Sequence, residues 1–442
     1  MRFAVLLLAA GMLAGVPTQS LCAAERVFAM GIAGSNPSDT RYQARRYFQK
    51  PEVRRLVERL ETGPLQADEI VGALAGSGTS LDDLVRTKIV RETGTGYRIG
   101  FNYFTLADMR RIHATAEEFV PSLVAAYRSH QGEFDRIFSR YPIKTVDRKA
   151  LATVVLAGFA LNWDALATSK DDGFRVPDMV VGDGWKYSFW AAEDDPAYST
   201  KGFVWGSSTL FGSGDNFAER PVDFVFSSFG DPDSDPRMNF PDLFYLPSGD
   251  LTPTVRHAVQ SVGLRDENYA GFPIEAALGV SRARSIGPML FALRRKPLRP
   301  GELAGFAQPS DRAQATHLIA LLVASRYISL RPDGRYALLQ PVFDASDAAM
   351  LNDALALHRR IFSSWLAETF PKAKARLGTI TAIRQGVAFE SAFTQIWHDY
   401  FGLATRQLAS AGMIADLNDP ASGYAGSIPV LWRRSIYKLD LG

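Results

Sequence analysis

The sharpest chemical pattern in the chain is a run of alternating carboxylates in GDPDSDPRMNFPD, residues 230–242. Counted as a twelve-residue loop, its oxygen-bearing side chains fall at positions 1, 3, 5, 9 and 12: Asp231, Asp233, Asp235, Asn239 and Asp242. Calcium loops present oxygen ligands from these positions, and a bound cation would relieve the repulsion between the carboxylates. Pro236 stands where such loops need glycine, and Asp242 is shorter than the usual bidentate Glu. Such a run is more often a proline-broken acidic surface loop, and a calcium site is the alternative.

A second group of carboxylates lies beside Trp190. Its members are Glu193, Asp194 and Asp195, with Asp215 and Glu219 farther along the chain. Paired carboxylates among aromatic residues suit glycoside hydrolysis, in which one acts as acid and the other as base or nucleophile. The alternative is an acidic loop with core aromatic residues behind it, because separation in space cannot be read from the sequence.

Two histidines stand beside carboxylates. His113 and Glu117 are four residues apart on an expected helix, which would put both on one face. A solvated helix face is the more frequent origin of such a pair. His398 and Asp399 follow Trp397, a pattern more frequent at a packed helix end than in a catalytic pair. The chain has no G-x-S-x-G elbow, P-loop, dinucleotide G-x-G-x-x-G or H-E-x-x-H zinc motif, so the sequence names no reaction.

Residues 170–282 differ from the rest of the chain in composition. They hold 18 Asp or Glu against 9 Lys or Arg, and 18 of the 50 aromatic residues. Stretches such as VDFVFSSF predict strands, punctuated by Gly, Pro and Ser. We expect an acidic, aromatic-rich β or irregular region. Its tryptophans are the best candidates for ligand contacts: Trp185, Trp190 and Trp205.

Two stretches 233 residues apart share one pattern. LETGPLQADEI, residues 60–70, aligns without a gap with LRRKPLRPGEL, residues 293–303. Around each stretch the sequence predicts three helices followed by a hairpin, and then a long helix. With four to six residues inserted in the second copy, the correspondence continues through the hairpin: Val90 with Ile328, Gly96 with Gly334, Tyr97 with Tyr336 and Phe104 with Phe343. The sequence therefore predicts an internal duplication.

Three helices that end in a two-stranded wing resemble the winged helix-turn-helix superfamily. The pairing of PLRPGEL with DGRYAL is most similar to winged-helix modules of small bacterial repressors and of methyltransferase dimerisation domains. The resemblance covers about 55 residues per copy and implies a fold without implying a function. The expected fold class is α+β, predominantly helical, with two winged-helix units around the middle region. Two copies in one chain would pair internally, as a pseudo-dimer within a monomer.

The charge of the third helix in each copy argues against DNA binding. In a DNA reader this helix enters the major groove, and basic residues meet the phosphates. Asp82, Asp83, Arg86 and Lys88 cancel in the first copy, and an apolar run over residues 318–324 occupies the second. The net charge of +2 also gives no general case for a nucleic-acid partner. Winged helices can instead dock other proteins.

The first 24 residues have the layout of a signal peptide. Arg2 precedes an apolar run from Phe3 to Val16, and small residues follow at Cys22-Ala23-Ala24. The run is shorter than the roughly 20 residues that a membrane-spanning helix needs. Cleavage after Ala24 would remove the single cysteine and with it any disulfide or thiol chemistry. We expect a soluble periplasmic or secreted protein without a transmembrane span.

At 442 residues the chain is too long for one core, and the patterns divide it into five parts. These are a signal peptide (1–24), a linker (25–50), a winged-helix unit with its long helix (51–169), the acidic middle region (170–282) and a second unit with a C-terminal tail (283–442). The leading hypothesis is a non-enzymatic binding or scaffolding protein for an unknown protein, peptide or glycan. The alternatives are a hydrolase using carboxylates of the middle region and, if the chain is not exported, a DNA-binding regulator.

Overall fold

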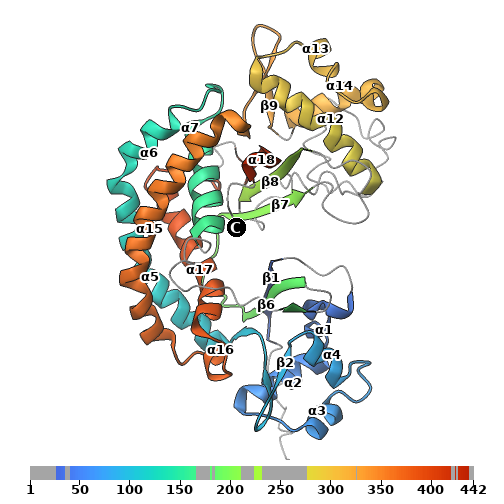
Figure 1. Cartoon of the computed structure of the whole chain (residues 1–442), viewed down its shortest axis with the longest axis vertical. Helices are drawn as coiled ribbons and strands as arrows, with labels where there is room; N and C mark the ends of the chain where they lie inside the picture. The colour runs from blue at the N-terminus through green and yellow to red at the C-terminus, as the bar shows by residue number, and fades with distance from the viewer. Residues whose placement is uncertain are drawn as a thin grey trace, which may run out of the picture.

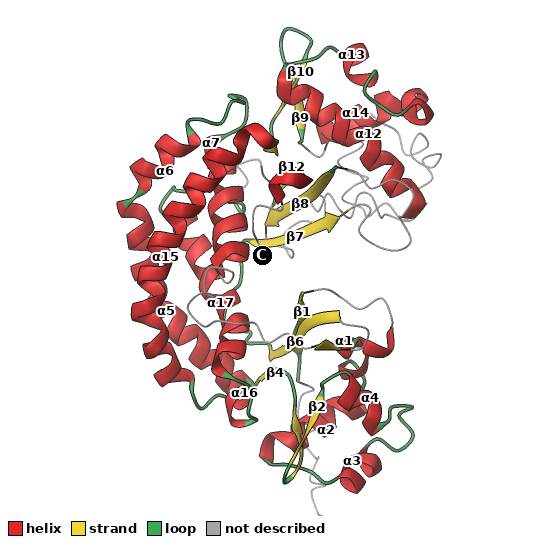
Figure 2. Cartoon of the chain, viewed as in Figure 1, coloured by secondary structure: helices red, strands yellow, loops and turns green. Residues whose placement is uncertain are grey.

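The computed structural model describes residues 26–34, 40–165, 180–181, 185–210, 223–230, 276–324, 326–419, 424 and 427–437. Within them the fold is mixed α+β and predominantly helical, as the sequence predicts. Helices form a spine along one side, and two smaller lobes project from it (Figures 1 and 2). No helix in these ranges is long and apolar enough to cross a membrane.

The spine contains long helices from both ends of the chain. Its elements are α5 (Leu106–Ser129), α6 (Gln131–Phe138), α7 (Arg148–Ala152), the π-helix η2 (Thr153–Asp164), α15 (Ala348–Leu377), α16 (Thr381–Arg384) and α17 (Phe389–Ser410). They are amphipathic or fully apolar, and one large hydrophobic cluster runs through the spine into the second lobe.

The lobes repeat one order of elements. The first has η1 (Thr40–Tyr42), α1 (Ala44–Phe48), α2 (Pro51–Thr62), α3 (Ala67–Ala73), α4 (Leu81–Arg86), β2 (Val90–Thr93) and β3 (Gly96–Ile99). The second has α12 (Ala276–Arg295), α13 (Pro300–Ala304), η5 (Pro309–Gln314), α14 (Ala315–Ala324), β9 (Ile328–Leu330) and β10 (Tyr336–Leu338), followed by η6 (Ala345–Asp347) before α15. Both predicted hairpins form, with β2 antiparallel to β3 and β9 to β10.

Two sheets join the lobes to the spine. The first has the order β1 (Phe28–Gly34), β6 (Trp185–Glu193), β4 (Asn102–Phe104), with β5 (Val180–Val181) also on β6. The second has the order β11 (Val342–Phe343), β12 (Ser427–Arg433), β8 (Phe224–Gly230), β7 (Trp205–Leu210), and α18 (Arg434–Tyr437) follows β12. In each sheet the strand that follows a hairpin pairs in parallel with a strand from much farther along the chain. These pairs are β4 with β6 and β11 with β12.

The sequence echo corresponds to the same hydrogen bonds in both lobes. Leu65 N–H donates to Tyr97 O at 3.1 Å, and Tyr97 N–H donates back at 2.8 Å. The aligned Leu298 and Tyr336 exchange the same two bonds at 3.1 and 2.7 Å. Each leucine thereby adds an isolated third bridge beside its hairpin. The aligned sequences therefore fold alike.

Helix ends repeat as well. The carboxylates of Glu69 and Glu302 accept hydrogen bonds from the amides of Gln66 and Arg299, at 2.8 and 2.7 Å, and so close matching capping boxes. Before each hairpin, a non-glycine residue has a positive φ, 60° at Lys88 and 56° at Arg326. L-residues rarely adopt this conformation, so its occurrence at corresponding positions is specific.

The leucines that begin the echo are both buried near the end of a helix. Leu60 and Leu293 lie near the C-terminal ends of α2 and α12, with exposed fractions of 0% and 3%. The next residues, Glu61 and Arg294, carry opposite charges and contact corresponding strands, β4 and β11. Glu61 accepts a bond from the Tyr103 hydroxyl, whereas Arg294 donates to the carbonyl of Val342 at 2.8 Å.

The first half of the chain, residues 26–193, and the second half, residues 276–437, cross in the spine. Tyr400 of α17 donates to Thr115 of α5 at 2.8 Å, so the last long helix of the second half packs on the first long helix of the first. Reciprocally, Arg359 of α15 pairs with Asp164 of η2 at 2.6 Å. Each half thus lays its long helix against the terminal helix of the other.

The structure differs from the expected boundaries at two places. The segment 25–50, expected as a linker, contains β1 and α1, and Phe28 and Phe48 of these elements are buried in the core of the first lobe. The middle region does not form a unit of its own in its described part, because β6 belongs to the first sheet and β8 to the second. Local strand composition could not indicate these distant partners.

Candidate functional site

A cavity of about 570 Å³ lies between the first sheet and the spine. Its walls come from β1 and β6 on one side and from α5 and α17 on the other. We call it the Trp190 cavity, after the tryptophan of β6 that lines it. The chain segments that meet here are far apart in sequence and come from both halves.

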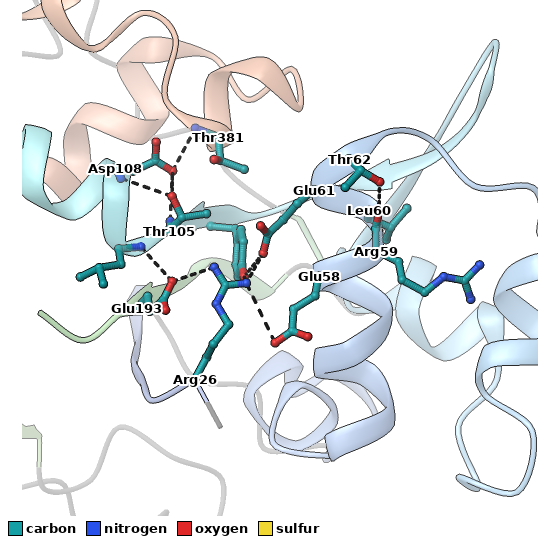
Figure 3. Close-up of polar contacts among 12 residues, drawn as sticks. Arg26, Glu58, Arg59, Leu60, Glu61, Thr62, Thr105, Asp108, Glu193 and Thr381 are labelled. Carbon is teal, nitrogen blue, oxygen red and sulfur yellow. Dashed lines mark hydrogen bonds and ion pairs between the residues drawn. The ribbon is translucent and has the colours of Figure 1, made fainter. Parts of the chain in front are cut away.

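A charged cluster fixes β6 at one edge of this cavity (Figure 3). Arg26 pairs with Glu193 at 2.7 Å and with Glu61 of α2 at 2.5 Å. Glu193 also accepts a bond from the Leu106 amide, at 2.9 Å, at the start of α5. Although partial burial opposes its ionisation, the bonds from Arg26 and Leu106 hold the pKa of Glu193 below its usual value. Glu193 is therefore an anchor that joins β6 to α5.

A second anchor lies at the beginning of α5. Asp108 accepts bonds from the amide of Thr105 at 3.0 Å and from the amide of Thr381 at 3.1 Å (Figure 3). The first bond caps α5, and the second ties this end to α16. Because α16 leads directly into α17, this contact sets the position of α17 opposite the sheet.

His113 of α5 lies between two carboxylates in the cavity. Its Nε2 is 3.3 Å from Oδ1 of Asp399 on α17, and its Nδ1 is 3.7 Å from Oδ2 of Asp195, just after β6. The Tyr198 ring stacks on the imidazole, with centroids 3.5 Å apart and planes within 10°. Since the carboxylates flank one ring, their nearest oxygens are separated by less than roughly 10 Å, close to the ~5–9.5 Å used by glycosidases.

Several polar atoms around this histidine lack a hydrogen-bond partner. They are both amide atoms of Gln395, the hydroxyl of Tyr198 and Nδ1 of His113. Gln395 is only 5% exposed, and all three residues line the Trp190 cavity. Buried polar groups are nearly always hydrogen-bonded, so unpaired groups that converge on one cavity indicate a place for a ligand or ordered water.

Trp190 and His398 add an aromatic wall. Their ring centroids are 6.4 Å apart, and both residues line the cavity. Burial lowers the pKa of His398 despite the opposing effect of Asp399 next to it. His398 is thus neutral near pH 7, and the cavity's buried charges are those around His113.

The predicted ligand-contact tryptophans have different outcomes. Trp190 lines the cavity as expected. Trp185 and Trp205 belong to β6 and β7, but their side chains lie outside what the structure describes. In the carboxylate group beside Trp190, Asp194 and Asp195 also line the cavity.

The predicted calcium ligands lie outside the described residues: Asp231, Asp233, Asp235, Asn239 and Asp242. Asp215 and Glu219 lie outside them as well. Within the described part of the chain, no group of three or more His, Cys, Asp or Glu could hold a metal ion. The calcium prediction therefore stays a prediction.

The two histidine interpretations need correction. His113 and Glu117 do not form one solvated face, because His113 is 7% exposed while Glu117 lies in solvent. The packing of α17 and of the turn at Asp195 against His113 shields its imidazole from solvent. His398 and Asp399 do not lie at a helix end, since α17 runs from Phe389 to Ser410. Asp399 instead faces the cavity, where it meets His113.

The second half has a large aromatic side chain at the register position that Ala192 holds in the first. Phe104 pairs with Ala192 beside the cavity, and the aligned Phe343 pairs with Trp432. The Trp432 ring is fully buried and stacks on Phe343 at 4.5 Å and on Phe159 at 5.3 Å. The strand register thus aligns Trp432 with Ala192. At this register position the first half thus has an alanine beside the Trp190 cavity, and the second half has a buried indole.

Tyr198 and Gln395 were not among the residues singled out by sequence. Gln395 had one available signal, a polar residue between buried Thr394 and Ile396 on a helix that is apolar on most faces. Comparison of the chain with family models, curated proteins and solved structures gave no match. The functional argument therefore depends on the geometry of the site itself.

Proposed function

We propose that this chain is an exported binding protein whose ligand occupies the Trp190 cavity. The carrying observation is the convergence of unpaired polar atoms, from Gln395, Tyr198 and His113, on one cavity at the junction of both halves. An unsatisfied buried polar group costs about 1–3 kcal/mol, so a bound ligand that satisfies several of them gains correspondingly in affinity. The volume is within the range of small-molecule sites.

The scaffold of this proposal is a pair of winged-helix units acting as structural modules. The matching bridges at Leu65 and Leu298, the matching capping boxes and the positive φ angles of Lys88 and Arg326 support a duplicated three-helix and wing unit. The reciprocal contacts of α5 with α17 and of α15 with η2 support an internal pseudo-dimer. The signal-peptide layout of residues 1–24 supports a periplasmic or secreted location.

Contacts of the third helix in the first unit support a function that does not involve DNA binding. In α4 the basic Arg86 is paired with Asp83 and also donates to the carbonyl of Arg41 at 3.3 Å. A phosphate-binding helix would hold such a side chain free for its ligand. Ligands of the cavity are accordingly sought among glycans, peptides and small molecules.

A ligand screen with a matched pair of variants tests the proposal. Purified mature chain is screened against glycans, peptides and metabolites by thermal shift, and hits are titrated by calorimetry. Gln395→Met should lower affinity about tenfold or more, because the ligand loses its amide partner. It should also raise the stability of the free chain, because two unpaired buried atoms disappear. Gln407→Met, the same change on the same helix outside the cavity, is the control.

The opposite pattern would refute binding in this cavity. If Gln395→Met lowers the stability of the free chain as a well-satisfied core residue would, the amide is not waiting for a ligand. If every hit binds Gln395→Met and Gln407→Met equally well, the ligand lies elsewhere.

A second candidate function is hydrolysis, and the placement of Asp195 and Asp399 on either side of His113 favours it. Two carboxylates within roughly 10 Å can act as acid and base, while His113 can relay or hold a proton between them. Turnover of screening hits distinguishes hydrolysis from binding. Asp195→Asn and Asp399→Asn should abolish product formation while retaining measurable ligand affinity; product release that persists in both variants excludes this mechanism.

A further inference from the structure

We propose that the Trp190 cavity binds an alkylammonium group, carried either by a small amine or by the lysine side chain of a peptide. The inference rests on the proposed binding function and adds the chemical class of the ligand. It is argued from the charges, the hydrogen-bond acceptors and the aromatic surfaces that meet in the cavity.

The first argument is charge. The side chains of Asp195 and Asp399 belong to residues that line the cavity, and they are only 5% and 16% exposed to solvent. Asp194 adds a third carboxylate among the lining residues. Arg110 approaches Asp195 only at 3.7 Å and is 61% exposed, so solvent screens that pair. Among the described ion pairs, His113 is the group that meets Asp399. A buried cation from a ligand would compensate these carboxylates.

Glu193 also lines the cavity, but its charge does not need a cation from a ligand. Its carboxylate is engaged by Arg26 at 2.7 Å and by the Leu106 amide at 2.9 Å, so it is already compensated. Asp195 accepts a bond from the Ala197 amide at 3.1 Å and lies 3.7 Å from Arg110, so Asp399 is the less compensated of the two buried carboxylates. The exposed Arg45 is the Lys or Arg side chain among the residues that line the cavity.

The second argument is hydrogen bonding. An ammonium group has three donors and no acceptor, so it needs several acceptors around one point. Gln395 supplies an unpaired amide oxygen, Tyr198 an unpaired hydroxyl and Asp399 a carboxylate. Gln395 is only 5% exposed, so its amide is shielded from bulk solvent. All three belong to residues that line the Trp190 cavity, where a ligand ammonium would supply donors to them.

The third argument is the surrounding surface. Trp190 and the ring of Tyr198 line the same cavity, and aromatic faces attract cations by about 0.5–2 kcal/mol. The cavity, about 570 Å³, is much larger than an ammonium ion. The remaining volume would hold the alkyl body, against Met109, Ile112 and Ile396. An alkylammonium therefore matches both the polar end and the apolar remainder.

Calorimetric titration with isosteric probe pairs tests the inference on the full mature chain. The small-amine arm compares cadaverine with its diol analogue, and the peptide arm compares N-acetyl-Gly-Lys-Gly-amide with the same peptide acetylated on the lysine Nζ. We expect the charged member of at least one pair to bind and its neutral partner to bind at least tenfold more weakly. Asp399→Asn should weaken that binding about tenfold or more, because a charge-assisted hydrogen bond is lost. Glu117→Gln, an exposed carboxylate on α5 near His113, should leave it unchanged.

Each other outcome overturns a defined part of the reasoning. Binding of the neutral diol, or of diacetylchitobiose, that depends on Gln395 while the amines do not bind would overturn the ammonium inference and leave the proposed function intact. Equal weakening by Asp399→Asn and Glu117→Gln would mean nonspecific charge attraction and would also overturn it. Failure of every probe and of the wider ligand screen would refute the proposed function itself.

Discussion

Stability of this chain should depend on pH through His358, a fully buried histidine in the middle of α15. Its Nδ1 hydrogen-bonds with the hydroxyl of Tyr127 on α5, and its Nε2 is 3.8 Å from the buried carboxylate of Asp164. Burial lowers the pKa of His358 to about 4, Asp164 opposes this shift, and Arg359 adds to it. The folded chain therefore holds the neutral ring.

The sign and size of the effect follow from linkage. A histidine takes up a proton near pH 6.5 in the unfolded chain and near pH 4 in the folded chain, so the unfolded state binds more protons between these values. The contribution of the neutral His358 ring to the unfolding free energy is fully present above about pH 6.5 and is lost as the pH falls toward 4. The total loss is about 3 kcal/mol, of which about 2 kcal/mol is lost between pH 7 and pH 5.

Urea denaturation at pH 7 and pH 5 measures this loss. His358→Gln keeps an acceptor for Tyr127 but cannot titrate, so its unfolding free energy should lose about 2 kcal/mol less than the wild type over this interval. His130→Gln, a half-buried position at the end of α5, serves as the control and should keep the wild-type pH dependence. A wild-type pH dependence in His358→Gln would refute the reasoning, whatever its absolute stability.

Two further predictions concern corresponding positions in the two halves of the chain. Lys88→Gly and Arg326→Gly should each raise the unfolding free energy by up to about 1 kcal/mol, because glycine relieves the positive φ; a loss at either position in urea denaturation would contradict the matched geometry. Trp432→Ala should cost about 3–5 kcal/mol by the same assay, because it empties a packed core, whereas Ala192→Trp should block ligand uptake in the calorimeter without unfolding the chain. Undiminished uptake by Ala192→Trp would show that the ligand avoids the Trp190 cavity.

Local patterns were sufficient to predict the repeated elements. The Gly96 turn, the alternation of Tyr97 and Ile99 and the aligned segment around Tyr336 predicted both hairpins, because turn chemistry and side-chain alternation act over a few residues. The correspondence of Leu60 with Leu293 could be predicted for the same reason, because similar local helix and turn geometry favours the same residue types.

The site could be predicted only in part. Trp190 stands next to its carboxylates in sequence, so that wall was apparent. The opposite wall was not, because Gln395 and Asp399 reach His113 only through the packing of α17 on α5. Periodicity indicates that one face of a helix is covered, but it does not say which distant segment covers it. The same limit applies to β1 and β6, whose pairing joins Ile32 to Phe189.

The crossing of the two halves in the spine also bears on ancestry. Because the Trp190 cavity takes its sheet wall from one half and its α17 wall from the other, a shorter chain with a single copy could close such a chamber only by pairing with its twin. That symmetric pair would own two chambers. Under the proposed duplication, fusion of two copies into one polypeptide would let them diverge, with a buried indole at position 432 in one and the Trp190 cavity in the other.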